Sequence, residues 1–117
     1  IAKIYDKELS VFSKFFIIQK IPKNCTHSYQ MYTTRVPKKY RSKFLNFMRS
    51  HRIEVSVHFD PPLHQQKYLK HFYKKKLPKT DILSKEIVTL PIYPDMNREQ
   101  VYYIIDTIKK FVSTLNL

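Results

Sequence analysis

Residues 53–64 constrain the fold more than any other part of this chain, because they begin as a strand and must stop at two consecutive prolines. Apolar and polar side chains alternate in the first part of the segment, with the two-residue period of a half-buried strand. Pro61 and Pro62 carry no N–H for a sheet ladder and fix their own φ, so strand pairing should end before them. The loop between His58 and His64 is therefore expected to be stiff. A functional site and an ordinary surface loop with two solvated histidines both fit this pattern.

The chain contains no glycine, although average usage would give about eight in 117 residues. This excludes a Walker loop, a dinucleotide-binding fingerprint and any other glycine-rich phosphate cradle within the segment. Any phosphate or cofactor chemistry must therefore use a cradle that this segment does not supply.

Composition predicts one folded domain of residues 1–117. Hydrophobic residues make up 43% of the chain and aromatic residues 15%, which is typical of a protein with a modest core. No apolar run approaches the ~20 residues that span a bilayer, and no signal peptide is visible at the start. The single cysteine, Cys25, excludes an internal disulfide and indicates a reducing compartment, with the cytoplasm as the expectation. The chain starts with Ile1 rather than Met, which suggests a piece of a larger protein.

The charge is strongly basic, with 22 Lys and Arg against nine Asp and Glu, a net charge of +13. Such a balance permits binding to nucleic acid, to an anionic membrane or to a phosphorylated substrate. The lysines are spread along the chain, and the only tight run is residues 74–76. We therefore expect no dedicated nucleic-acid module and no membrane partner. The alternative is a freestanding basic domain for nucleic acid or another polyanion, favoured by the interleaved aromatic and lysine residues of 71–76.

The periodicity and the turn residues predict an α+β domain, with a small mixed or antiparallel sheet packed with helices. Helices are expected over residues 1–12, 37–50, 64–73 and 81–87, and from residue 98 onward. Strands or extended segments are expected over residues 15–23, 28–36, 53–58 and 90–94. Thr80 is the expected cap of the fourth helix, and Asn97 with Gln100 should form a capping box at the fifth. Residues 28–59 then read as a βαβ unit.

Two of these helices show a clear apolar face. In the helix of residues 37–50, Phe44, Leu45 and Met48 should face the core, and Arg41 should point outward. The inward stripe of the last helix is Val101, Ile104, Ile105, Ile108 and Val112. This stripe is expected to pack on the sheet rather than to bind a partner.

Three blocks, in this order along the chain, resemble the C-terminal small domain of the DegT/DnrJ/StrS aminotransferases. They are SYQMYTTRVP at 28–37, IEVSVHFDPPLH at 53–64 and LPIYPDM at 90–96. The resemblance covers essentially the whole chain, and residues 1–13 resemble the helix that leads out of the large domain. It implies the C-terminal domain of a fold-type I enzyme that depends on pyridoxal 5'-phosphate and aminates nucleotide-linked keto sugars. The most similar branch makes amino sugars for surface polysaccharides.

The resemblance also implies where the chemistry lies. The Schiff-base lysine, the aspartate facing the pyridine nitrogen and the phosphate-binding groups belong to the large domain, so no catalytic residue is expected here. The 117 residues alone should then be inactive. His58, Phe59, His64 and Gln65 correspond to positions that reach or brace the substrate site. Phe59 stands where relatives have tyrosine, so a hydroxyl contact is lost. A metal site built from His58, His64 and Asp60 is not expected, because the spacing lacks a helix or hairpin to hold it.

The implied partners are a nucleotide sugar, an amino-acid donor that is usually glutamate, and a second subunit in a homodimer. A non-catalytic remnant of such an enzyme remains the third alternative. The chain departs from the family at His51 and Arg52, where relatives commonly have glycine after the helix. A left-handed residue with a Cβ costs about 1 kcal/mol or more, so this turn is expected to be built differently.

Overall fold

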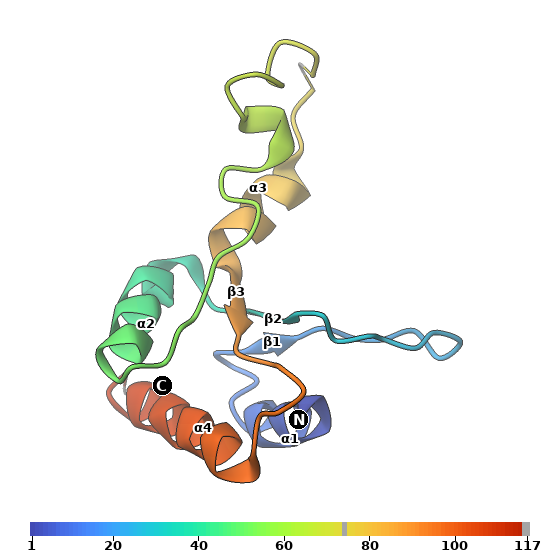
Figure 1. The fold of residues 1–117 in the computed structure, drawn as a ribbon. Coiled ribbons are helices and arrows are strands. Elements are labelled where there is room, and N and C mark those ends of the chain that lie inside the picture. The colour runs from blue at the N-terminus through green and yellow to red at the C-terminus, as the bar shows by residue number, and fades with distance from the viewer. Residues whose placement is uncertain (74, 116–117) are drawn as a thin grey trace.

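The computed structural model describes residues 1–73 and 75–115. Within these residues, four α-helices accompany a three-stranded antiparallel sheet in the order β1-β2-β3 (Figure 1). The elements are α1 (Ala2–Ser10), β1 (Ile17–Ile18), β2 (Tyr32–Arg35), α2 (Lys38–Ser50), the short 3₁₀ helix η1 (Leu63–Gln65), α3 (Pro78–Glu86), β3 (Ile87–Leu90) and α4 (Arg98–Ser113). The expected α+β class with a small antiparallel sheet is confirmed.

One face of the sheet carries the core. Tyr32 and Thr34 of β2 lie opposite Leu90 and Val88 of β3, and all four side chains are buried. The alternate residues of β2, Thr33 and Arg35, belong to the other face and are only half-buried. Figure 1 shows α1, α2 and α4 gathered on one side of the strands. The helix α3 points away from β3 and, with η1 and the turns between them, forms a projecting arm of residues 63–73 and 75–86. The second face of the sheet is therefore the more open one.

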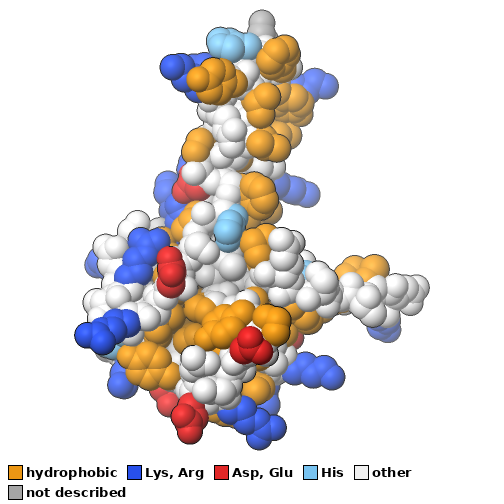
Figure 2. Space-filling view, in the orientation of Figure 1, with side chains coloured by type: hydrophobic (Ala, Val, Ile, Leu, Met, Phe, Trp, Pro, Cys, Tyr) orange, Lys and Arg blue, Asp and Glu red, His pale blue; other side chains and the backbone are white. Residues whose placement is uncertain are grey.

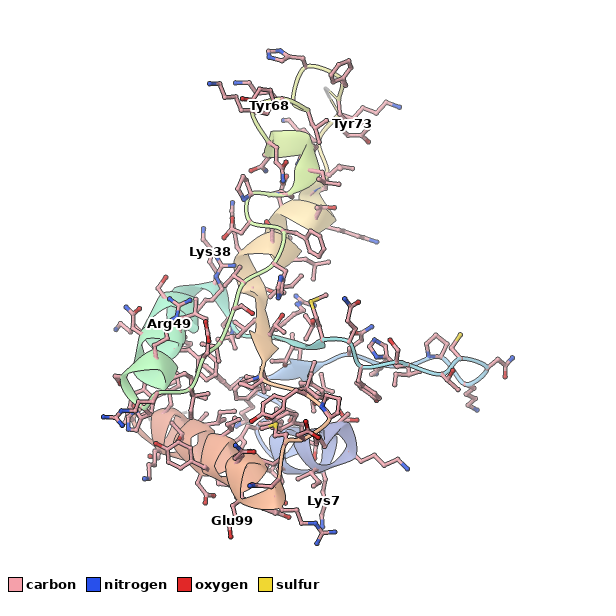
Figure 3. All side chains as sticks on the ribbon, viewed as in Figure 1. Lys7, Lys38, Arg49, Tyr68, Tyr73 and Glu99 are labelled. Atoms are coloured by element: carbon pink, nitrogen blue, oxygen red, sulfur yellow. The ribbon has the colours of Figure 1, made fainter. Side chains whose placement is uncertain are left out.

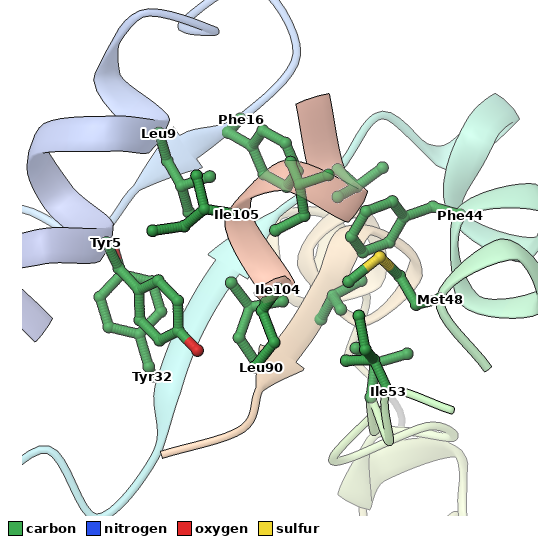
Figure 4. Packing of buried hydrophobic residues seen from close by; sticks show 14 of the residues in the cluster. Tyr5, Leu9, Phe16, Tyr32, Phe44, Met48, Ile53, Leu90, Ile104 and Ile105 are labelled. Carbon is green, nitrogen blue, oxygen red and sulfur yellow. The ribbon is translucent and has the colours of Figure 1, made fainter. Parts of the chain in front are cut away.

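Aromatic rings dominate the core between the sheet and the helices (Figure 4). Phe44 of α2 is fully buried, and its ring centroid lies 5.3 Å from that of Phe111 in α4 and 5.6 Å from that of Phe16. Phe15 lies 5.8 Å from Phe111 and closes the cluster. These edge-on and tilted arrangements are the favoured geometries of aromatic pairs. They join α2, α4 and the segment before β1 into one packed unit.

Two tyrosines tie α1 to the rest of the domain. The Tyr5 hydroxyl donates to the Pro91 carbonyl oxygen at 2.9 Å, and the Tyr32 hydroxyl donates to Asp6 at 2.7 Å. Burial raises the pKa of Tyr32 well above its ordinary value, and the hydrogen bond to Asp6 raises that pKa further. Burial likewise raises the pKa of Tyr5. Both hydroxyls thus remain protonated donors at neutral pH.

The expected start of α4 is confirmed. The Asn97 side chain accepts from the Gln100 N–H at 2.9 Å, and the Gln100 side chain accepts from the Asn97 N–H at 3.0 Å. Four residues of the predicted inward stripe are buried, namely Val101, Ile104, Ile105 and Ile108, and Val112 packs partly buried against them. Phe111, which the stripe did not include, is buried as well.

The predicted strand over residues 53–58 is wrong as an element. Only Ser56 pairs, in an isolated antiparallel bridge with Thr89 of β3. Ile53 and Val55 are buried as the alternation predicts, but Phe59 turns outward with a φ of 60° and ends the alternation. The expected βαβ unit is present in altered form, because β3 lies between β2 and the bridge at Ser56.

The predicted helix over residues 64–73 is also wrong. After η1 the backbone at Gln66 is extended, and turns follow up to Tyr73. Tyr68 and Phe72, which the prediction placed one turn apart, are 81% and 85% exposed. A helix here would bury neither ring within this segment, so its formation would gain little from packing.

The boundaries of the next two elements differ from the predictions. The helix α3 begins at Pro78, which suits the first turn because a proline lacks the N–H that would be unpaired there, so Thr80 is not its cap. The strand β3 begins at Ile87, where the prediction ended the helix, and it pairs with β2 along its whole length. Three of its four side chains are buried, a pattern that alternation does not reveal.

The turn after α2 is a left-handed turn of the kind that favours glycine, so the expectation of a different construction is wrong. Arg52 has a φ of 58°. Its N–H donates to the Arg49 carbonyl at 2.9 Å, and the Ile53 N–H donates to the Met48 carbonyl at 3.0 Å. This pair of bonds defines a Schellman motif, with an arginine at the left-handed position that favours glycine.

We expect Arg52→Gly to raise the free energy of unfolding by about 1 kcal/mol, because it removes the Cβ from a left-handed residue. Lys43→Gly is the matched control, since it lies exposed within α2 and should lower stability by about 1 kcal/mol. Urea denaturation of both variants measures the difference. A destabilised Arg52→Gly protein would contradict the assigned turn.

Candidate functional site

The candidate loop, residues 58–65, starts from the bridge between Ser56 and Thr89. The Ser56 N–H donates to Thr89 at 3.2 Å, and the Thr89 N–H donates back to Ser56 at 2.9 Å. Two residues later His58 is half-buried, and its Nε2 lies 3.2 Å from the Ser56 hydroxyl. The predicted site residue His58 is thus held two residues after the bridge at Ser56.

Phe59 is the next candidate residue, and the structure exposes 64% of it. Its positive φ turns the ring away from the face that Ile53 and Val55 share. Residues with a Cβ adopt this backbone region at a cost, and such residues cluster at functional sites. An aromatic ring held outward in this way is available to a ligand or to another part of the protein.

Arg41 holds the middle of the candidate loop. Its Nη2 lies 2.7 Å from Oδ2 of Asp60, and its Nη1 donates to the Ser84 carbonyl of α3. The Arg41 side chain is only 15% exposed, so the prediction that it points outward from α2 is wrong. Because one guanidinium group bonds both the loop and α3, Arg41 joins three segments that are distant in sequence.

Asp81 of α3 holds the far end of the loop. The Nε2 of His64 lies 2.9 Å from Oδ1 of Asp81, and the Gln65 amide donates to the same oxygen. The His64 side chain is 13% exposed. Both predicted site residues therefore point to α3, in an arrangement that braces the loop.

The four predicted site residues fall into two pairs. His58 and Phe59 lie where the chain leaves the sheet. His64 and Gln65 belong to η1 and are bonded to Asp81 of α3. Among the hydrogen bonds of the described residues, none joins His58 to His64. The loop connects the pairs without bringing their imidazoles into direct contact.

Sequence reasoning missed Arg41 and Asp81. A signal for Arg41 was present, because it precedes Phe44, Leu45 and Met48 by three, four and seven residues and so shares their side of the helix. An arginine on an apolar face usually has a partner. Its partners Asp60 and Ser84 could not be identified from the pattern.

An apolar groove of about 630 Å³ runs along the arm beside the candidate loop. Phe59, Leu63 and His64 line it from the loop, and Tyr73, Leu77 and Leu83 line it from the rest of the arm. Its volume lies within the ~300–1,000 Å³ typical of small-molecule sites. Figure 2 shows hydrophobic side chains along this arm with Lys and Arg at its edges. Phe59 and His64 thus belong to a larger concave surface.

The aromatic and basic segment that suggested polyanion binding lies at the end of the arm. Figure 3 places Tyr68 and Tyr73 there, far from Lys38 and Arg49 on α2. Lys74, the first residue of the expected basic run, lies outside the described residues.

In the described part of the chain, no group of three His, Cys, Asp or Glu side chains is placed to hold a metal ion. None of the helices in residues 1–73 and 75–115 is long and apolar enough to cross a membrane. Cys25 is exposed and free.

Comparison with known families decides the assignment. Residues 1–109 match the DegT/DnrJ/EryC1/StrS aminotransferase family. The chain belongs to this family. Members of the DegT/DnrJ/EryC1/StrS family are sugar aminotransferases that use pyridoxal phosphate.

Individual relatives are similar over nearly the whole chain. The uncharacterized protein MJ1066 of Methanocaldococcus jannaschii is 32% identical over 119 residues, which cover 97% of this chain and 31% of that protein. GDP-perosamine synthase of Escherichia coli O157:H7 is 30% identical over 119 residues, covering 97% of this chain and 30% of the enzyme. The chain therefore spans about a third of the length of these relatives.

Solved structures show the same fold. The aminotransferase TlmJ from Streptoalloteichus hindustanus superposes with a TM-score of 0.87 at 20% identity. The superposition covers 97% of this chain and 30% of TlmJ.

Proposed function

We propose that this chain is the C-terminal part of an aminotransferase that acts on nucleotide-linked keto sugars in amino-sugar synthesis for surface polysaccharide. Family membership over residues 1–109 supports the sugar aminotransferase assignment. The name of one relative, GDP-perosamine synthase, supports a nucleotide-linked sugar as substrate. The family match includes the basic segment of the arm and so favours an aminotransferase over a freestanding polyanion-binding domain.

The proposal assigns the missing chemistry to the rest of the parent protein. Residues 58–65 contain no lysine, so the loop lacks the primary amine to which pyridoxal phosphate binds in its enzymes. When bound, the cofactor supplies the electron sink for amino transfer. The four predicted site residues of the loop carry imidazole, amide and aromatic groups, which suit contacts to sugar hydroxyls and rings. We therefore propose that the 117 residues alone do not transaminate.

Further features of the parent enzyme belong to the same proposal. The helix α1 would lead out of a large domain that carries the Schiff-base lysine, with glutamate as the amino donor. The enzyme would be a cytoplasmic homodimer. The length of the relatives, of which this chain spans about a third, supports the large domain.

The single observation that carries the proposed site is the fixed loop between the sheet and α3. His58, held by Ser56, presents a ring nitrogen that can donate to or accept from a sugar hydroxyl near neutral pH. Phe59 supplies an exposed apolar ring next to it. His64 and Gln65, bonded to Asp81, would line the same site and keep the loop in place.

We expect His58→Ala in the full-length enzyme to lower kcat/KM roughly tenfold or more, the loss expected when one good hydrogen bond to substrate disappears. Stability should change by no more than about 0.5–1 kcal/mol, because His58 is only half-buried. Steady-state kinetics with a nucleotide-linked keto sugar and a thermal melt measure both quantities.

The matched control is His51→Ala. His51 also lies within hydrogen-bond distance of a serine hydroxyl, at 3.2 Å from Ser50, but it caps α2 away from the loop. Its activity should equal that of the unmodified enzyme. Unchanged kinetics in His58→Ala would remove the loop from the substrate site.

A further inference from the structure

Ser56 is the best-anchored residue next to the candidate loop. Both of its backbone groups bond Thr89, at 3.2 and 2.9 Å, and β3 in turn pairs with β2 over four residues. The position of the Ser56 hydroxyl is therefore set by the sheet rather than by the loop. A side chain that bonds this hydroxyl is therefore held relative to the sheet.

The group bonded to it is the His58 imidazole. The distance from Ser56 Oγ to His58 Nε2 is 3.2 Å, and residues two apart on an extended segment share a face. A serine hydroxyl can donate or accept, so it can bond Nε2 in either neutral tautomer. In both cases the bond holds the ring in place, and Nδ1 is the ring nitrogen left for a ligand.

A second observation concerns the same face of the sheet. Directly opposed residues of an antiparallel pair lie on one face, so the Thr89 side chain lies on the Ser56 side. Thr89 is 7% exposed, and its hydroxyl has no hydrogen-bond partner within the described residues. A buried hydroxyl without a partner is costly. A hydrogen-bond partner for the Thr89 hydroxyl would therefore come from outside the described residues.

We infer that Ser56 is the positioning residue for His58: its hydroxyl fixes the orientation of the imidazole that meets the sugar. The inference rests on the proposed function, because it requires His58 to contact substrate. Ser56 itself touches no reacting atom and acts only through His58.

The test uses the full-length enzyme with ¹⁵N-labelled histidine. In Ser56→Ala we expect the ¹⁵N shift of His58 Nε2 to move, because this nitrogen loses its hydrogen bond, and kcat/KM to fall about fivefold, because the ring is no longer held in its orientation. Ser56→Thr keeps the hydroxyl and should restore both readings. Ser50→Ala, which removes the hydroxyl beside His51, is the matched control and should change neither the His58 signals nor activity.

Each outcome is separable from failure of the proposed function. If His58→Ala is fully active, the proposed function fails whatever the ¹⁵N shifts of Ser56→Ala. If His58→Ala is impaired but Ser56→Ala leaves the His58 ¹⁵N shifts and kcat/KM unchanged, the proposed function stands and the positioning role of Ser56 is overturned. A thermal melt of Ser56→Ala shows that the protein is folded. Failure of Ser56→Thr to restore the ¹⁵N shift of His58 Nε2 would also overturn the inference.

Discussion

Phe44→Ala is expected to lower the free energy of unfolding by about 3–5 kcal/mol, the range measured when a buried phenylalanine is truncated in a core. Phe44 is 0% exposed and contacts rings from both other parts of the aromatic cluster, with Phe16 at 5.6 Å and Phe111 at 5.3 Å. The neighbouring rings belong to different elements and cannot all collapse into the space that is left. Urea denaturation followed by circular dichroism measures the loss.

Phe72→Ala is the matched control for Phe44→Ala. The same atoms are removed, but Phe72 is 85% exposed at the end of the arm. Its stability should change by less than about 0.5 kcal/mol. Similar losses in the two variants would mean that the arm is part of the core, or that Phe44 is not.

The helices that the sequence predicted well are those in which a local signal and a long-range contact agree. The last helix has a capping box at Asn97 and a continuous inward stripe, and each of these alone would place it. The helix after Pro37 likewise combines a proline start with Phe44 and Met48 on one side. Both helices could be predicted without knowing which residues they pack against, because an apolar face can pack on any apolar surface.

The failures occur where the partner decides the structure. Residues 53–58 alternate like a strand, but only Ser56 forms a bridge to β3, and the backbone turns at Phe59. Residues 64–73 have helical spacing at Tyr68 and Phe72, yet neither ring is buried in the described chain. Periodicity reports which residues could share a face, whereas burial depends on what covers that face.

The candidate site also has residues that the sequence indicated and contacts that it did not. The two histidines stand out in the sequence because prolines separate them, and the structure does fix both. What fixes them is remote: Arg41 precedes Asp60 by 19 residues, and Asp81 follows His64 by 17. Such pairs depend on the approach of α2 and α3, which no local pattern in the chain encodes.

Arg41→Ala is expected to lower kcat/KM of the full-length enzyme about tenfold, as His58→Ala does, because a displaced loop weakens the contact between His58 and substrate. The guanidinium group bonds Asp60 at 2.7 Å and the Ser84 carbonyl, so its loss frees the loop that holds both His58 and Phe59. Stability should fall by about 2 kcal/mol, since a mostly buried charged donor leaves two acceptors unpaired.

The decisive measurement is a double-mutant cycle of Arg41→Ala with His58→Ala, followed by steady-state kinetics and urea denaturation. If Arg41 acts by placing His58, its effect on kcat/KM should shrink in the His58→Ala background, while its effect on stability should remain. Arg41→Lys should rescue activity poorly, because an ammonium group cannot reproduce the fork that reaches both acceptors. Lys43→Ala, exposed on the same helix, should leave activity and stability unchanged. Full additivity of Arg41→Ala and His58→Ala in kcat/KM would show that Arg41 does not work through this histidine.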